Sequence, residues 1–132
     1  MRSMFRNWER GAAMVEFALL LPLFLLIIGG IVDGGRAFFR QIELTNAARE
    51  GVRVAVMSEP TPAEIQLRAQ SAAPGFTLTA TLQRACPSPD GAEVMVASDF
   101  DWFFLGPALA LVGGSDNMPR VLDSTAVMRC GG

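Results

Sequence analysis

Residues 11–32 read GAAMVEFALLLPLFLLIIGGIV and form the most apolar stretch of the chain. Only Glu16 and Pro22 interrupt it. A bilayer core takes about 20 apolar residues in helical form to cross, so this stretch is long enough to span. The sequence therefore predicts a transmembrane helix over residues 12–35, preceded by a basic segment at residues 1–11.

Three kinds of N-terminal segment share this pattern: a secretory signal peptide, a plain single-pass anchor, and a prepilin-type leader whose apolar helix is kept after cleavage. The positive charges of Arg2, Arg6 and Arg10 fit all three. A signal peptide has an apolar core of about 7 to 15 residues, and the uncharged run at residues 17–32 is slightly too long for one. Glu16 also breaks the transition from positive to apolar. The pattern therefore disfavours a secretory signal.

Glu16 is the residue of this stretch that needs an explanation. A carboxylate at the centre of a membrane helix costs roughly 2.5 to 3.5 kcal/mol on insertion scales, and such residues usually have a partner or a function. Two explanations are open. The side chain lies only a few positions from Arg10 and can reach water at the membrane edge, or it pairs with a positive charge when subunits assemble.

The sequence around this acid resembles a known family. Residues 10–22, RGAAMVEFALLLP, resemble the start of the TadE-like minor pseudopilins of tight-adherence (Tad/Flp, type IVc) pili. Residues 33–37, DGGRA, and 46–53, NAAREGVR, are similar to the segment after the membrane helix in that family. The resemblance extends to about residue 56. It departs from the family pattern at Gly34, where an aromatic residue more usually follows the acid, and in its two cysteines.

The resemblance implies how the N-terminus is processed and used. A prepilin peptidase would cut between Gly11 and Ala12, which makes Glu16 the fifth residue of the mature chain. In pilin-like families this acid, followed here by Phe17, meets the new N-terminal amine of its own or a neighbouring helix. That pairing lowers the cost of burying both charges. The implied partners are the peptidase, other pilin and pseudopilin subunits, the pilus assembly machinery and membrane lipid.

Charge and composition disfavour several classes of function. The net charge is −2, and removing residues 1–11, with three arginines and one glutamate, changes it to −4. Such a chain is an unsuitable partner for nucleic acid. It has no histidine, tyrosine or lysine, so the commonest general base, zinc ligand and Schiff-base amine are missing. Asp99 and Asp101 are too few ligands for calcium. We therefore expect no enzyme, no catalytic residue, no cofactor and no metal site.

Cys86 and Cys130 are the two cysteines, and both follow the apolar stretch. They are too far apart for a two-cysteine metal knuckle, which leaves a structural disulfide or two unpaired buried thiols. A disulfide requires an oxidising compartment. Together with the positive charges before the membrane segment, it favours an N-terminus inside and a C-terminus outside, and the family resemblance implies a single-pass protein of the bacterial inner membrane. The N-terminus would be cytoplasmic, and the C-terminal domain periplasmic and available to a pilus.

Residues 36–57 are predicted to continue the membrane helix. A modest apolar stripe marks one face of this continuation: Phe38, Ile42, Thr45, Ala48, Val52 and Val56. Three oppositely charged pairs are spaced one turn apart, as on a solvated helix face: Asp33–Arg36, Arg40–Glu43 and Glu50–Arg53. Glycines at residues 29, 30, 34 and 35 permit a bend or the close approach of another element.

Residues 58–132 are predicted to form a small extracytoplasmic α+β domain, pilin-like in outline, with a short helix and an antiparallel sheet of about three strands. The helix is expected over residues 62–73, because Thr61-Pro62-Ala63-Glu64 is a capping box with proline at the first helical position. Alternating apolar and polar residues between turn clusters predict strands at 76–82, 93–100 and 121–129. A core of this size is marginal.

The connection between the last two predicted strands is unusually apolar. It contains Trp102-Phe103-Phe104-Leu105, followed by residues 108–112. These aromatic residues either fill the core of a small domain or form a contact surface for another subunit or the membrane. The sequence leaves both interpretations open.

These patterns predict a minor pseudopilin-like subunit that serves the biogenesis of tight-adherence pili by helix packing and turns over no substrate. The alternative is an unprocessed bitopic scaffold or sensor with an extracytoplasmic binding module. The two hypotheses differ in whether residues 1–11 stay attached. A membrane-tethered hydrolase would need an acid pair or a serine site that these residues do not supply.

Overall fold

The computed structural model describes residues 2–57, 60–111, 113–114 and 118–131, with side chains from Gly11 onward. Ser58 and Gly132, the ends of the predicted C-terminal domain, lie outside the described residues, as does the first residue of the predicted leader. The chain divides into two compact units. The helical unit comprises residues 1–34 and 102–116, and the sheet unit comprises residues 35–101 and 117–132.

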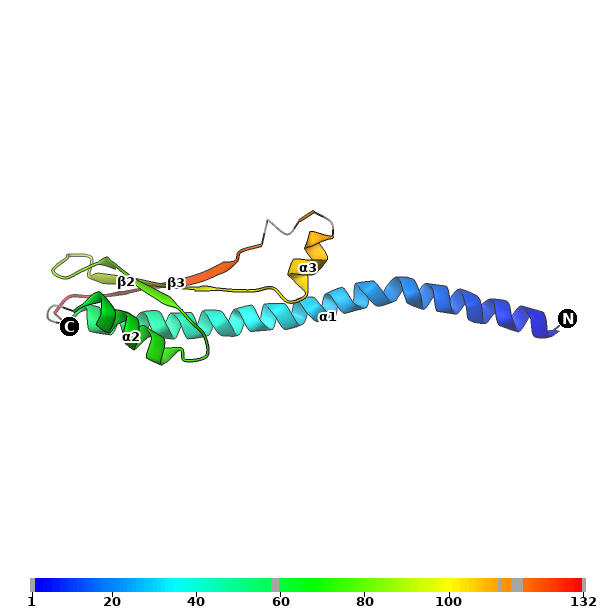
Figure 1. The fold of residues 1–132 in the computed structure, drawn as a ribbon, viewed down its shortest axis with the longest axis horizontal. Helices are drawn as coiled ribbons and strands as arrows, with labels where there is room; N and C mark the ends of the chain where they lie inside the picture. Colours follow the sequence, from blue (N-terminus) through cyan, green and yellow to red (C-terminus); the bar gives the residue numbers. More distant parts are fainter. Residues whose placement is uncertain (1, 58–59, 112, 115–117, 132) are drawn as a thin grey trace. The chain divides into compact units, whose positions relative to one another are not determined.

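Helix α1 runs without a break over Arg2–Ala55 (Figure 1). It therefore includes described residues of the predicted leader, all of the predicted transmembrane segment and nearly all of its predicted continuation. Pro22 lies inside it. By length and composition, residues 11–55 are one helix that can cross a membrane. The prediction of a single long helix is confirmed, and the helix ends two residues before the predicted limit of 57.

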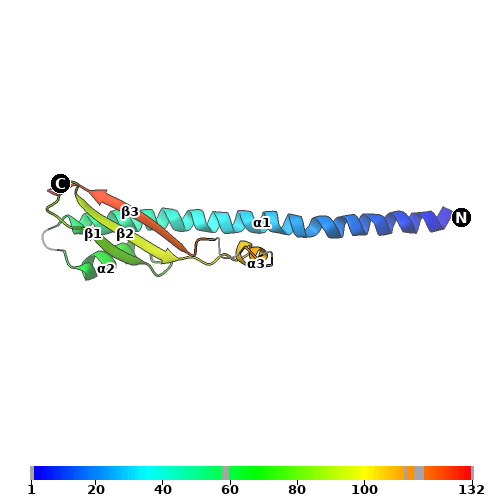
Figure 2. The same cartoon turned by 90° about the horizontal axis from the view of Figure 1, so that it is seen from above.

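The sheet unit contains three strands, β1 (Thr79–Arg84), β2 (Ala92–Asp99) and β3 (Val121–Met128). β2 lies in the middle and pairs antiparallel with both neighbours (Figure 2). The α+β class and the three antiparallel strands are confirmed. The second and third strands begin and end within one residue of their predicted bounds.

The core of the sheet unit lies between one face of the sheet and two helices, the C-terminal part of α1 and α2 (Pro62–Ala72) (Figure 1). Alternate residues of β2 point into it, so Val94 and Val96 are fully buried. α1 approaches β2 closely at Gly51, where an added Cβ would lie 3.2 Å from a methyl group of Val94. The opposite face of the sheet is largely exposed, as the alternation in β1 and β3 predicts.

The buried face of α1 in this unit differs from the predicted stripe. It consists of residues that recur every three or four positions: Leu44, Ala47, Ala48, Gly51, Val52 and Ala55. Phe38 and Ile42, which the stripe included, are exposed, with 67% of the Phe38 side chain accessible. Ala48 and Val52 were assigned correctly. The stripe was wrong at its start because the small side chains, rather than the large ones, permit close packing of the helix on the sheet.

Helix α2 begins at the predicted capping box. The Thr61 hydroxyl accepts a hydrogen bond from the Glu64 backbone N–H (3.3 Å), and the Glu64 carboxylate accepts one from the Thr61 backbone N–H (2.9 Å). The hydrogen bond from the Thr61 backbone, followed by that from its hydroxyl, lowers the pKa of Glu64. Ile65 and Ala69 are the buried residues of α2.

Strand β1 begins three residues later than predicted, because side chains of α2 take the backbone hydrogen bonds of the preceding segment. Gln70 accepts from the Leu78 N–H (3.2 Å) and donates to the Phe76 carbonyl (2.7 Å). Gln66 donates to the Leu78 carbonyl (2.8 Å) and accepts from the Ala80 N–H (2.7 Å). The side-chain amides of Gln66 and Gln70 thus form the hydrogen bonds that a neighbouring strand would otherwise form along the outer edge of β1.

Candidate functional site

The predicted cleavage site lies on the exposed part of α1 in the helical unit. Gly11 and Ala12 are both helical and both exposed. An ideal Cβ added to Gly11 would have no heavy atom within 4 Å. Every residue from 11 to 28 is exposed, and the large apolar side chains among them leave 41% to 76% of their surface uncovered. An apolar helix surface of this extent suits lipid or other helices rather than water.

Glu16 and Phe17 lie one turn beyond the predicted cleavage site, and both side chains are exposed. Among the side chains that the structure describes, which start at Gly11, Glu16 has no ion-pair partner. Among these described side chains, the carboxylate is therefore a single negative group in an apolar surface. Such a group gains most from a positive charge supplied by another helix or by a new N-terminus.

Asp33 ends the uncharged run of α1, and its carboxylate is fully buried. One oxygen accepts a hydrogen bond from the Phe103 N–H (3.0 Å). The other accepts from the Phe104 N–H (2.8 Å) and the Leu105 N–H (2.9 Å). The predicted solvated position of Asp33 is wrong, because this acid caps the segment that leads into α3 (Leu105–Ala110). Three charge-assisted hydrogen bonds make it a strong local tether.

Gly29 lies one turn before Asp33 on α1 and lets the same segment come close. A Cβ on Gly29 would lie 2.6 Å from the Phe104 Cβ, a separation that real side chains do not reach. A Cβ on Gly30 would lie 3.7 Å from a methyl group of Leu105. The glycines at 29 and 30 thus serve packing, one of the two roles expected for them, whereas Gly34 and Gly35 face open space.

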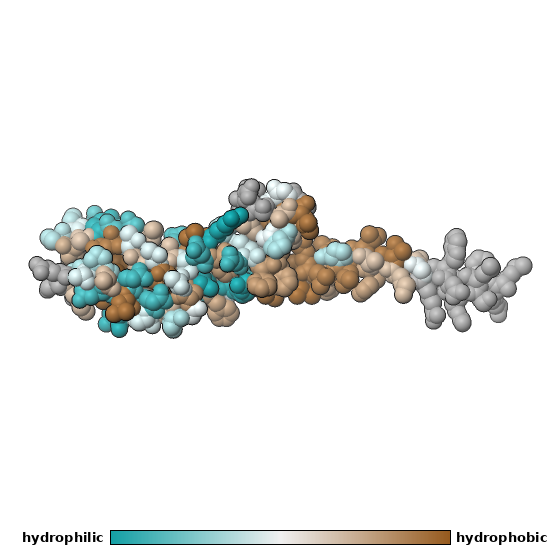
Figure 3. All heavy atoms as spheres, viewed as in Figure 1, coloured by the Kyte–Doolittle hydropathy of each residue, from teal (hydrophilic) through white to brown (hydrophobic). Residues whose placement is uncertain are grey.

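The aromatic segment that follows β2 is only partly covered in the helical unit. Phe103 is 70% exposed and Phe104 50% exposed, and α3 has no buried residue. Their rings lie 6.0 Å apart in a tilted arrangement. The interpretation that these phenylalanines fill a core is therefore wrong, and the alternative of a contact surface fits the exposure. Figure 3 shows hydrophobic residues gathered along the N-terminal part of α1 and at α3.

Sequence reasoning missed the contact between Asp33 and the aromatic segment. The partners are 70 to 72 residues apart, so no local pattern predicts the pairing. One weak signal was present: the residue before α3, Phe104, is an N-cap without a capping side chain. A helix start without its own cap implies an acceptor from elsewhere in the chain.

Charged residues of α1 in the sheet unit hold the helix to its neighbours. The Arg40 guanidinium lies 3.6 Å from the centre of the Phe76 ring and donates to the Ser98 hydroxyl (3.3 Å). The predicted pairing of Arg40 with Glu43 is thus replaced by contacts with the start of the hairpin and with β2. Gln41 donates to the Asp123 carbonyl of β3 (2.7 Å).

Glu50 links α1 to α2. It pairs with Arg53, as predicted (3.3 Å), and more closely with Arg68 of α2 (2.7 Å). The hydrogen bond from Arg68 is the main reason that the pKa of the Glu50 carboxyl lies below its usual value. The pair is largely solvent-exposed, so it orients α2 more than it stabilises the unit.

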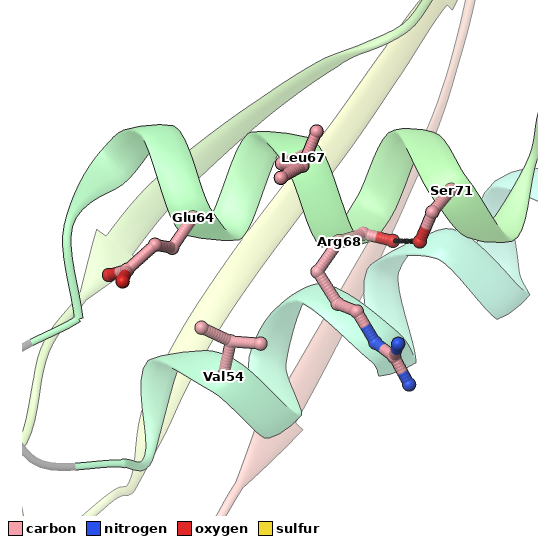
Figure 4. A pocket seen from close by; sticks show the side chains of 5 residues that line it. All are labelled: Val54, Glu64, Leu67, Arg68 and Ser71. Carbon is pink, nitrogen blue, oxygen red and sulfur yellow. Dashed lines mark hydrogen bonds between the residues drawn. The ribbon is translucent and has the colours of Figure 1, made fainter.

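A shallow groove of about 400 Å³ lies between α2 and the end of α1, lined by Val54, Glu64, Leu67, Arg68 and Ser71 (Figure 4). The Ser71 hydroxyl donates to the Arg68 carbonyl (2.7 Å), and the Glu64 carboxylate is held by the capping box. The Arg68 guanidinium is paired with Glu50 of α1, so the polar groups of the groove already have partners and do not converge on a reactive centre. Among the described residues, no group of three histidine, cysteine, aspartate or glutamate side chains could hold a metal ion.

The disulfide expected from the sequence is present. Cys86 and Cys130 are bonded, with Cα atoms 5.8 Å apart and a sequence separation of 44. The bridge ties the turn after β1 to the end of β3, across the middle strand. It closes the sheet unit at one end without contributing to a reactive site.

Comparison with known families gives one finding. Residues 11–53, about a third of the chain, match the model of a family described as TadE-like protein. The match covers the exposed apolar helix, Glu16, Asp33 and the first part of α1 in the sheet unit. The resemblance to the TadE-like family is confirmed over these residues. Comparison with curated proteins and with solved structures gives no match.

Proposed function

Since residues 11–53 of this chain are TadE-like, we propose that it is a minor pseudopilin-like subunit for the biogenesis of tight-adherence pili. The observation that carries the proposal is the exposed apolar surface of residues 11–28, in which Glu16 is the one charged side chain. A surface of this kind needs lipid before assembly and other helices after it. The subunit acts by packing and catalyses no reaction.

The proposed mechanism starts with removal of residues 1–11. Cleavage between Gly11 and Ala12 gives a new amine four residues before Glu16. In an α-helix, residues four apart lie on the same face, about 6 Å apart along the axis. The amine and the carboxylate of the same or a neighbouring subunit then neutralise each other, and the charge no longer opposes helix packing in an apolar environment.

We further propose an orientation with the N-terminus in the cytoplasm and the sheet unit on the periplasmic side of the inner membrane. The disulfide of the sheet unit supports this, because such bonds persist in oxidising compartments. The proposed partners are prepilin peptidase, other pilin and pseudopilin subunits, and the assembly machinery of the pilus. The membrane holds the subunit until these partners take it up.

Co-expression with a prepilin peptidase tests the processing step. We expect the chain to begin at Ala12 and the Gly11→Leu variant to remain uncut, because the peptidase must accommodate the residue before the cleaved bond. The measurement is the N-terminal mass of the membrane-extracted chain. Gly34→Leu is the matched control, since a side chain at Gly34, like one at Gly11, would enter open space; this variant should be cut normally.

An unchanged mass with active peptidase present would contradict the proposal. It would favour the alternative function, a bitopic scaffold or sensor that keeps its basic N-terminal segment. In that case the groove between α2 and the end of α1 would be the first surface to test for binding.

A further inference from the structure

We propose that residues 102–111, named here the α3 arm, form an interfacial membrane anchor. The arm lies in the polar–apolar boundary of the bilayer beside α1 and fixes how deeply that helix sits. The proposal rests on the membrane insertion of α1 in the proposed function. It adds a second lipid-binding surface, which the sequence left undecided between core and contact.

The arm is held at the end of the apolar run of α1. Phe104 packs against Gly29, and Leu105 approaches Gly30. Asp33, four residues after Gly29, binds the three backbone N–H groups at residues 103–105. Four helical residues span about 6 Å. The first turn of the arm, which contacts Gly29, therefore lies about 6 Å along α1 from Asp33, towards the apolar segment. Interfacial helices lie about 5 to 10 Å deep in the headgroup boundary.

The side chains of the arm suit this position. Residues 102–114 contain no charged side chain. Phe103 is 70% exposed and Leu111 88% exposed. Tryptophan is enriched at membrane–water interfaces because its ring is apolar and its N–H is polar. Trp102 starts the arm at the end where Asp101 precedes it, which is where an interfacial tryptophan is expected.

The backbone N–H groups at residues 103–105 of the arm have hydrogen-bond partners within the chain, which suits a lipid environment. N–H groups at the start of a helix have no partner within the helix, and a donor without a partner is costly where water is scarce. Asp33 accepts the hydrogen bonds of Phe103, Phe104 and Leu105, so these three donors, just before and at the first residue of α3, need no water.

Lipid is favoured over a protein partner because the arm continues the surface of α1. The residues that hold it, Gly29 and Gly30, lie inside the apolar run that must be in the bilayer. Any occupant of the exposed phenylalanine surface therefore lies at membrane depth. Before assembly, the occupant at that depth is lipid.

The test places the full-length chain in phosphatidylcholine–phosphatidylglycerol vesicles and measures the fluorescence of Trp102. Trp8→Phe leaves Trp102 as the sole tryptophan. We expect lipids brominated near the headgroup to reduce its emission about twofold, since interfacial tryptophan lies in that layer. Lipids brominated near the chain end should reduce it less, and aqueous acrylamide should have a weak effect.

A reporter on the sheet unit provides the matched control. Leu67→Trp, in a chain that also carries Trp8→Phe and Trp102→Phe, puts a tryptophan at an α2 position that is 72% exposed. This reporter should respond to acrylamide and not to brominated lipid. The double variant Phe103→Ser/Leu111→Ser and the variant Asp33→Asn should each shift the response of Trp102 towards that of the control.

The proposal is overturned if Trp102 responds like the α2 reporter while the chain still floats with the vesicles. The exposed phenylalanine surface would then be assigned to a protein partner. This result would leave the pilus function intact, because the assay needs neither cleavage nor assembly. A chain that fails to float would instead contradict membrane insertion and with it the proposed function.

Discussion

Glu16 and Asp33 are two acids on one helix with opposite surroundings. Asp33 is buried, and its carboxylate accepts three backbone hydrogen bonds from its own chain. Glu16 is exposed among apolar side chains and has no ion-pair partner among the side chains described. The Asp33 carboxylate therefore stabilises the fold of its own chain. Glu16 is available to another molecule, which is why we assign assembly to it.

Glu16→Gln should therefore separate insertion from assembly. The neutral amide removes a cost of roughly 2.5 to 3.5 kcal/mol for a carboxylate in the membrane, so the variant should insert at least as well as the original chain. It also removes the charge that the new amine needs, so we expect few or no pili. The measurements are the membrane-bound fraction and the pili sheared from cells. Glu16→Asp keeps the charge and should retain part of the piliation; normal piliation of Glu16→Gln would exclude this residue from the mechanism.

Elements that depend on neighbours in sequence could be predicted, and those that depend on distant residues could not. The capping box set the start of α2 correctly because its partners are three residues apart. β1 begins later than predicted because the side chains of Gln66 and Gln70 in α2 form hydrogen bonds with the backbone before it. Side-chain hydrogen bonds of this kind leave no periodic pattern in the sequence. α3 was missed as a helix because its cap, Asp33, comes from another element.

Gln66→Ala tests whether α2 completes the edge of β1. The variant leaves the Leu78 carbonyl and the Ala80 N–H without their present partners. At about 0.5 to 1.5 kcal/mol for each hydrogen bond, we expect the free energy of unfolding to fall by about 1 to 3 kcal/mol. Urea unfolding in detergent, followed by circular dichroism, measures it. Gln83→Ala, on the exposed face of β1, is the control and should change stability little; an equal loss in both variants would refute the edge role.

At the scale of the whole molecule, helix α1 belongs to both units, and the surroundings of its side chains differ between them. In the helical unit α1 exposes an apolar surface, whereas in the sheet unit it buries small side chains against a sheet. The TadE-like match covers α1 in both units and ends before the sheet. The long apolar helix and the disulfide could be predicted, because an apolar stretch and a pair of cysteines are visible in the composition alone. The division into units could not, since residues 102–116 join the helical unit from far along the chain.

The disulfide should carry much of the stability of the sheet unit. Closing a loop of this length contributes about 3 to 4 kcal/mol in the chain-entropy model, and the core is small. Reduction, or the double variant Cys86→Ser/Cys130→Ser, should lower the urea midpoint of the sheet unit and leave membrane insertion unchanged. Circular dichroism with and without reductant measures the shift. The double variant should not respond to reductant, and a midpoint that reduction leaves unchanged would show that the bridge is dispensable.

The cap that Asp33 provides also sets an order of events during biosynthesis. Phe103 follows Asp33 by 70 residues, and ribosomes add about 5 to 20 residues per second. Asp33 therefore waits roughly 4 to 14 s, on that rate, before the amides it binds exist. During that delay the Asp33 carboxylate lacks its three backbone donors, so in the proposed membrane-inserted chain it favours the polar side of the bilayer boundary until the arm arrives.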